Sequence, residues 1–282
     1  MTENKDFFQK AKRIVLKIGS SLLVDEGTGR VKHTWLNSLA DDVAAARERG
    51  KDVIIVTSGA VAVGRRALGL PSGKLSLPKK QAAAAVGQIR LAHYYQEILA
   101  ERGLNVAQVL LTLDDSEDRK RYLNARNTLN TLLDIGAVPV INENDTVAAA
   151  EIKVGDNDRL AARVAQMASA DALIIFSDID GLYNADPRKN PEAQLIPVVT
   201  KLTKEIEAMG GGSGSSVGTG GMATKLNAAR IASYSGADMI IANAKDVGVL
   251  HKIFEDDFIG TVFLSNKDED FYIPDFIEEN MG

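Results

Sequence analysis

The chain of 282 residues contains no cysteine, which excludes a disulfide scaffold as well as thiol-based catalysis or metal binding. No apolar stretch approaches the ~20 residues needed to span a bilayer, and the opening segment MTENKDFFQKAKR lacks the apolar core of a signal peptide. The chain also has no excess of basic charge, because its formal net charge is −5, and this argues against a nucleic-acid partner. We therefore expect a cytoplasmic protein with neither a membrane nor a nucleic-acid partner.

Several common site signatures are missing too. The three histidines, His33, His93 and His251, have no mutual spacing typical of a site. No G-x-x-x-x-G-K-[ST] motif occurs, so a P-loop is excluded, and no segment fits a calcium-binding EF-hand loop. We expect no metal site built from the side chains of the chain itself.

A glycine-rich segment is the most informative feature that is present. Residues 210–225 read GGGSGSSVGTGGMATK, and the residues from Met222 onward have helical spacing with Lys225 near the first turn. Glycines let backbone N–H groups converge on an anion, and a following helix adds its positive dipole end. A lysine at this end of a helix is unusual, because the dipole favours cations at the other end. The pattern indicates a phosphate-binding loop.

Two other interpretations of this loop are open. A Gly/Ser linker is one, although too few residues follow it for a second domain of typical size, roughly 50 residues or more. A relaxed dinucleotide pattern is the other, with Gly218, Gly220 and Ala223 and a ribose-binding acid at Asp238. That pattern should directly follow a strand, and here a polar glycine tract precedes it.

Short apolar runs alternate with helical patterns along the chain. The expected strands are 13–18, 52–57, 106–111, 138–141, 172–176, 238–241 and 261–264. Strands that are apolar on both faces and separated by helices indicate βαβ units. With 45% hydrophobic residues the chain can bury a large core. We predict an α/β fold: an open, mainly parallel sheet with helices on both faces, an αβα sandwich.

Small and polar residues follow four of these strands. They are KIGSS at 17–21, TSGA at 57–60, NEND at 142–145 and SDIDG at 177–181. In an open parallel sheet, ligands bind beyond the carboxyl ends of the strands, so these segments predict one cleft for a polar, anionic ligand. Lys17 and Lys225 are interpreted as two ammonium groups that face the same phosphate. Ordinary turns and a lysine on an edge strand are the alternatives.

Together these segments resemble the amino acid kinase family. The motifs that carry the resemblance are VLKIGSSLL at 15–23, VTSGAVAVG at 56–64, VPVINENDTVA at 138–148, EIKVGDNDRLAA at 151–162, SDIDGLYNADPR at 177–188 and GTGGMATK at 218–225. The first and last are family-wide, whereas NEND followed by EIKVGDND is specific to the branch that phosphorylates glutamate. Many members of that branch carry a C-terminal PUA domain, and we expect a kinase domain at 1–264 and a tail at 265–282 without that domain.

The resemblance implies an ATP-dependent enzyme that converts L-glutamate to L-glutamyl 5-phosphate, the first step of proline biosynthesis. It assigns catalysis to Lys17, Lys225 and Asp158, and glutamate binding to Ser58, Asp145 and Asn157. It assigns ATP binding to Lys17, Ser177, Asp178, Thr219, Gly220, Gly221, Met222, Ala223, Thr224 and Lys225. Mg²⁺ would sit on phosphate oxygens and water. The family also implies proline inhibition at the glutamate site and a dimer or tetramer.

Three alternatives to this activity remain at this stage. Another branch of the family would act on N-acetylglutamate, aspartate or carbamate. A catalytically silent sensor of nucleotides or amino acids could share the fold, since fold does not fix function. A dinucleotide-dependent oxidoreductase rests on the relaxed glycine pattern alone.

Overall fold

A computed structural model describes residues 5–25, 27–147, 157–210 and 221–265 of the chain. Eight strands within these residues form one sheet, in the order β3-β4-β2-β1-β5-β7-β8-β6. The strands are β1 Arg13–Ile18, β2 Asp52–Val56, β3 Val106–Leu111, β4 Val138–Glu143, β5 Ala172–Ser177, β6 Val198–Val199, β7 Asp238–Asn243 and β8 Gly260–Phe263. The predicted strands are confirmed to within two residues at each end, and only the two-residue β6 was not expected.

Neighbouring strands pair in parallel, with one antiparallel pair. β1 pairs with β2 and β5, β2 with β4, β4 with β3, and β5 with β7, all in parallel. β8 runs antiparallel to β7 and parallel to β6. The expectation of a mainly parallel sheet is confirmed.

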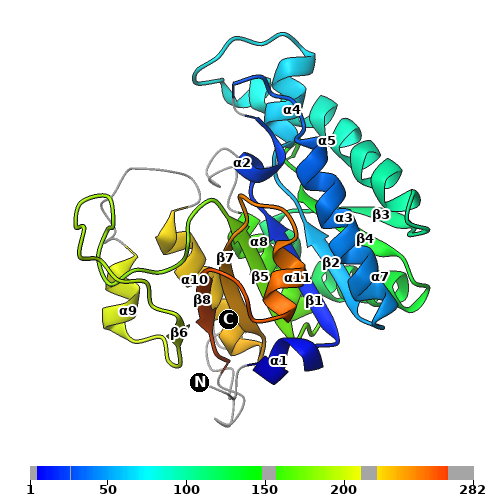
Figure 1. The fold of residues 1–282 in the computed structure, drawn as a ribbon. Coiled ribbons are helices and arrows are strands. Elements are labelled where there is room, and N and C mark those ends of the chain that lie inside the picture. The colour runs from blue at the N-terminus through cyan, green and yellow to red at the C-terminus, as the bar shows by residue number, and fades with distance from the viewer. Residues whose placement is uncertain (1–4, 26, 148–156, 211–220, 266–282) are drawn as a thin grey trace, which may run out of the picture.

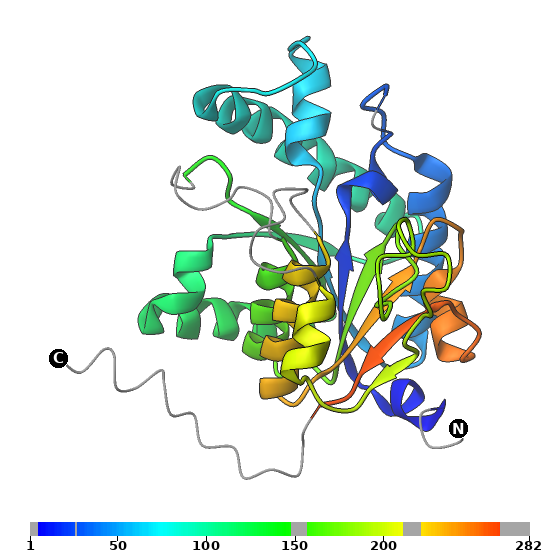
Figure 2. The same ribbon diagram turned by 90° about the vertical axis from the view of Figure 1, so that its left-hand side faces the viewer.

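Helices cover both faces of this sheet, as Figures 1 and 2 show. The helices are α1 Lys5–Lys10, α2 Ser20–Leu23, α3 His33–Glu48, α4 Ala60–Ala67, α5 Leu77–Ala100, α6 Leu113–Glu117, α7 Arg119–Asp134, α8 Asn157–Met167, α9 Lys204–Met209, α10 Met222–Tyr234 and α11 Val249–Phe254. One apolar cluster joins the sheet to α3, α5 and α11, and a second joins it to α7, α8 and α10. Because strand residues alternate between the two clusters, each central strand is buried on both faces.

Helix α4 and the start of α5 extend beyond the sheet at the top of Figure 1, and the rest of α5 packs against the sheet. Their backbones touch where Gly64 and Gly87 cross: a Cβ on Gly64 would lie 1.7 Å from the Ala83 oxygen, and one on Gly87 would lie 1.7 Å from the Ala60 oxygen. No residue larger than glycine fits at either position. α5 starts with Pro78 in its first turn and is followed by Gly103 at φ +72°, and both residue types are typical of these positions at the two ends of a helix.

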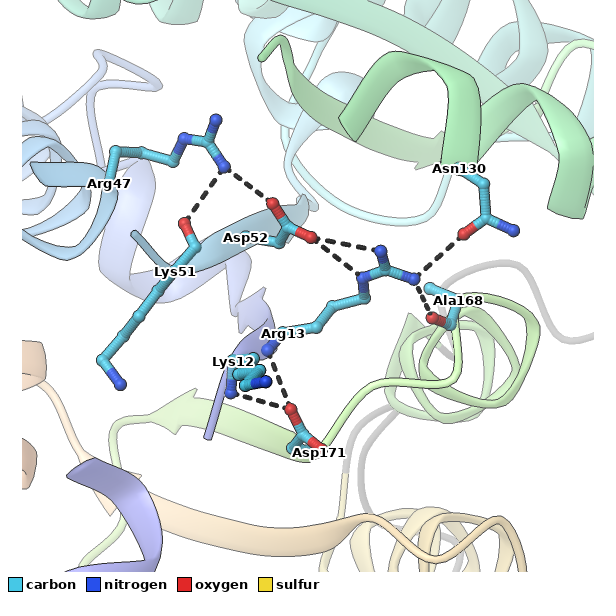
Figure 3. A network of polar contacts seen from close by, with 8 residues as sticks. All are labelled: Lys12, Arg13, Arg47, Lys51, Asp52, Asn130, Ala168 and Asp171. Atoms are coloured by element: carbon cyan, nitrogen blue, oxygen red, sulfur yellow. Dashed lines mark hydrogen bonds and ion pairs between the residues drawn. The ribbon is translucent and has the colours of Figure 1, made fainter. Parts of the chain in front are cut away.

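A polar network fastens the opposite, amino-terminal end of the strands (Figure 3). The Arg13 guanidinium donates to Asp52 Oδ2 over 3.1 and 3.2 Å, to Asn130 Oδ1 over 2.9 Å and to the Ala168 oxygen over 2.5 Å. Arg47 donates to the other Asp52 oxygen over 2.9 Å. This network links β1, β2, α3, α7 and the end of α8 at the end of the sheet that is remote from the predicted cleft.

Candidate active site

A cleft of about 640 Å³ opens at the carboxyl ends of the strands. Its lining comes from the segments after β1, β2, β4 and β5, from the first turns of α4, α5 and α8, and from α10. The residues are Lys17, Gly19, Ser20, Ser21, Ser58, Gly59, Ala60, Val61, Ala62, Arg65, Lys80, Asn142, Asp145, Asn157, Phe176, Ser177, Asp178 and Lys225. All four polar segments singled out in the sequence therefore meet in one place.

Two lysines and one aspartate form the charged floor of this cleft. Asp158, in the first turn of α8, is 1% exposed. Its Oδ1 lies 2.5 Å from the Lys17 ammonium on β1, and its Oδ2 lies 2.9 Å from the Lys225 ammonium on α10. The two cations thus share one carboxylate that comes from a third element.

The Asp158 carboxylate is kept ionised by its contacts with the two lysines and not by solvent. Burial alone would raise the pKa of Asp158, but the ammonium groups of Lys17 and Lys225 hold it below its usual value. The first turn of a helix also favours an anion, whereas Lys225 stands in the first turn of α10, where the dipole disfavours a cation. The contact with Asp158 offsets that cost. Two cations facing one anion leave a net positive charge toward the cleft.

The start of α10 is tied to the same carboxylate. Thr224 Oγ1 donates to Asp158 Oδ2 over 3.0 Å and lies 2.8 Å from the oxygen of Gly221, the residue before the helix. Met222 and Ala223 lie in this first turn but do not line the cleft. The predicted contacts of Thr219 and Gly220 fall outside the described residues.

The half of the cleft next to β2 and β4 carries the residues that are predicted to bind the substrate glutamate. Asn157 Nδ2 donates to Ser58 Oγ over 2.8 Å and to the Thr57 oxygen over 3.3 Å. Its buried Oδ1 has no hydrogen-bond partner among the described residues. Gly59, between Ser58 and α4, adopts φ +103°, a conformation that other residues rarely take.

Asp145 lies in the same half and is 8% exposed. No basic side chain in the described ranges forms an ion pair with it, and burial raises its pKa to about 6. A buried carboxylate without a cation is costly, so this position is suited to a ligand that brings a positive charge.

Sequence reasoning did not identify two cations of the cleft. Arg65 near the end of α4 and Lys80 in the first turn of α5 both line it. No local pattern distinguishes them from surface residues, because their position depends on how the α4–α5 pair crosses above the sheet. Asn142, within the NEND segment, also lines the cleft, and its buried Nδ2 has no partner in the described part of the chain.

The other half of the cleft is built on the end of β5. Ser177 ends β5, is 7% exposed and is followed by the exposed Asp178. Beyond them, Asp180 accepts from Asn243 over 2.6 Å and from the Tyr183 hydroxyl over 2.9 Å. The hydrogen bond from Asn243, followed by that from Tyr183, lowers the pKa of Asp180.

The dinucleotide interpretation is wrong for Asp238. This residue begins β7, at the amino-terminal end of the strand, and its Oδ1 accepts the backbone N–H of Ser265 over 2.7 Å. It therefore lies at the opposite end of the sheet from the cleft and cannot bind a ribose there.

The sequence and the fold correspond to a known class. The sequence pattern of the Amino acid kinase family matches residues 12–243, and the chain belongs to this family. The solved structures of a UMP kinase from Ureaplasma parvum and of a carbamate kinase from Giardia lamblia each share the fold, with a TM-score of 0.64 at 15% identity over 91% of the chain. They cover 100% and 99% of those proteins.

Within the family, the curated relatives are glutamate 5-kinases. The chain is 64% identical over 258 residues to the glutamate 5-kinase of Paramagnetospirillum magneticum, covering 92% of this chain and 69% of that protein. It is 62% identical over 232 residues to that of Rhodospirillum rubrum, covering 82% of this chain and 62% of that protein. The chain thus spans about two thirds of the length of these relatives. It belongs to the glutamate 5-kinase branch of the amino acid kinases.

No helix in the described ranges is long and apolar enough to cross a membrane.

Proposed function

We propose that the chain transfers the γ-phosphoryl group of ATP to the γ-carboxylate of L-glutamate, forming L-glutamyl 5-phosphate for proline biosynthesis in the cytoplasm. The observation that carries this proposal is the position of Lys17, Asp158 and Lys225 between two different halves of one cleft. The residues that we assign to the phosphoryl acceptor, glutamate, lie on one side of the cluster, and those that we assign to the phosphoryl donor, ATP, lie on the other. A phosphoryl group that passes between them would meet both ammonium groups.

Phosphoryl transfer depends on positioning and charge neutralisation more than on covalent help from the protein. Lys17 and Lys225 would contact the transferred group from two sides, and Asp158 would hold both ammonium groups in position. A glutamate γ-carboxylate has a reference pKa near 4.3 and is ionised at neutral pH, so the reaction needs no general base. The cluster of two lysines and one aspartate is sufficient for this role.

The acceptor half suits an amino acid. The Asp145 carboxylate would pair with the α-ammonium group of glutamate, and Ser58 and Asn157 would bind its oxygens and orient it. Arg65 and Lys80 at the same half of the cleft are suited to the α-carboxylate. Proline carries the same ammonium and carboxylate groups, and we extend the proposal to proline as a competitor at this half.

The donor half would bind ATP. Ser177 and Asp178 line the cleft there. We assign the ATP phosphates to residues 219–225, which are the end of the glycine-rich segment. Within the described residues, no three acidic or histidine side chains converge as a metal site. We therefore propose that Mg²⁺ accompanies ATP on its phosphate oxygens and water, and we assign it to no protein residue.

The test is consumption of ATP with a panel of acceptors in the presence of hydroxylamine, which traps an acyl phosphate as a hydroxamate. Glutamate should give a hydroxamate, whereas aspartate, N-acetylglutamate and carbamate should give much less. ATP consumption without hydroxamate would show transfer to another group. ATP binding without consumption for any acceptor would favour the silent sensor. A dimer or tetramer, which the family resemblance supports, is checked by light scattering during gel filtration.

A further inference from the structure

Two buried polar side chains of α5 contact the acceptor half of the cleft from beneath. Gln88 and Tyr95 are 6% and 1% exposed, and neither lines the cleft. They are seven residues apart, so they lie two turns from each other on the same face of the helix. Buried polar groups of this kind are retained at a cost unless they are hydrogen-bonded.

Both side chains bond to the ends of strands that carry acceptor residues. Gln88 Nε2 donates to the oxygen of Glu143 over 2.8 Å, and Glu143 ends β4 two residues before Asp145. The Tyr95 hydroxyl lies 2.9 Å from Thr57 Oγ1, and Thr57 follows β2 directly before Ser58. One helix therefore fixes the two strand ends from which the acceptor residues extend.

A third contact ties α5 to the same region. Gly87, next to Gln88, packs directly against the Ala60 backbone at the start of α4, two residues after Ser58. The Thr57 oxygen also accepts from Asn157 Nδ2, so a shift of the β2 end would disturb Ser58 and Asn157 together. On the donor half, neither Ser177 nor Asp178 is bonded to α5 in the described part of the chain, where Gln88 and Tyr95 bond to the ends of β4 and β2.

We propose that Gln88 and Tyr95 are positioning residues of the acceptor site, which set the affinity for the amino acid through the ends of β4 and β2 and leave ATP binding unchanged. This inference rests on the proposed function for the identity of the acceptor. The hydrogen bonds of Gln88 and Tyr95 do not depend on that identity.

The variants that test it remove one hydrogen-bonding group at nearly constant shape. Tyr95→Phe and Gln88→Met should each raise the KM for glutamate by about three- to tenfold, with the KM for ATP changed by less than about twofold. Matched controls lie on the same helix: Tyr94→Phe and Gln96→Met make the same chemical changes at positions without these bonds. Both controls should leave both constants unchanged.

A double-mutant cycle separates positioning from general loss of packing. Thr57→Ser keeps the hydroxyl that faces Tyr95 and should keep the KM for glutamate near that of the wild type. Thr57→Val removes it, and the double variant Thr57→Val/Tyr95→Phe should be no worse than either single variant, because both partners are then apolar. Additive effects, or equal increases in KM for glutamate and ATP, would overturn the inference.

Hydrogen exchange measured without substrate distinguishes this inference from the proposed function. Tyr95→Phe should increase amide exchange at residues 57–61, and Gln88→Met at 143–147, with 177–181 unchanged. If the wild-type chain does not phosphorylate glutamate, the proposed function fails and the exchange pattern alone decides the positioning role. Unchanged exchange at both segments would contradict it even in an active enzyme.

Discussion

Asn157 donates its side-chain amide to the Ser58 hydroxyl over 2.8 Å, so the first residue of α8 is bonded to the segment that follows β2. The next residue in the helix, Asp158, contacts both lysines. Two consecutive residues at one helix start therefore connect the acceptor half of the cleft to its charged floor. Under the proposed function, acceptor binding and phosphoryl transfer would share the start of α8, which would favour a fixed distance between the two substrates.

Replacing either lysine should affect catalysis more than nucleotide affinity. If Lys17 and Lys225 neutralise charge that grows in the transition state, Lys225→Ala should lower kcat by roughly 10² to 10³. The dissociation constant for ATP, measured by calorimetry, should change much less. Lys204→Ala, at an exposed position on α9, serves as the control. A near-normal kcat in either the Lys17 or the Lys225 variant would exclude the assigned role.

Asp158→Asn should destabilise the protein and make its stability more dependent on ATP. The two buried ammonium groups would then lose the carboxylate that they share, and we expect a loss of stability of about 3 to 5 kcal/mol. ATP supplies negative charge at the same place, so it should raise the melting temperature of the variant more than that of the wild type. Thermal scans with and without ATP measure both effects. An equal shift in the two proteins would contradict this account of the cluster.

Local patterns in the sequence were sufficient for most of the fold and for the two lysines of the floor, whereas Asp158 was assigned only through the family resemblance. Apolar runs located the strands, and Lys17 and Lys225 were conspicuous for their positions beside glycine-rich turns. The reversed direction of β8 and the short β6 had no such signal. Arg65 and Lys80 were missed for a different reason: the close crossing at Gly64 and Gly87 places them, and that contact exists only once two helices meet. In isolation each glycine only weakens its helix.

Arg13 should contribute to stability and not to activity. Its side chain is 22% exposed, and its guanidinium bonds Asp52, Asn130 and the Ala168 oxygen at the end of the sheet opposite the cleft. Arg13→Met keeps much of the apolar stem but removes these bonds, and Asp52 keeps only its contact with Arg47, so we expect a loss of about 1 to 3 kcal/mol in urea unfolding. Arg188→Met, which removes an exposed pair with Asp186, should cause no measurable change. A loss of kcat/KM with unchanged stability would refute the assignment of Arg13 to stability and not to activity.

Activity toward glutamate should depend on pH through Asp145. Burial raises its pKa to about 6, so its carboxyl is protonated below that pH and cannot pair with an ammonium group. We expect kcat/KM for glutamate to rise as the pH increases through about 6 and then to level off, because this constant reports ionisations of the free enzyme and the free substrate. Asp145→Asn should remove this step and lower the plateau. An unaltered pH profile in the variant would assign the step to another group.

Acceptor choice tests the narrowest part of the proposal. Glutamate offers a free ammonium group to the buried Asp145, whereas N-acetylglutamate replaces that cation with a neutral amide and an acetyl group. Binding it would leave the Asp145 carboxylate buried without a counter-charge, which is costly. We expect glutamate to be preferred by about 10² or more in kcat/KM, and Asp145→Ala to raise the KM for glutamate far more than that for ATP. Hydroxamate formation from each acceptor, at matched ATP concentration, measures the preference. Comparable turnover of the two acceptors would contradict recognition of the ammonium group by Asp145, even if ATP-dependent acyl phosphate formation is observed.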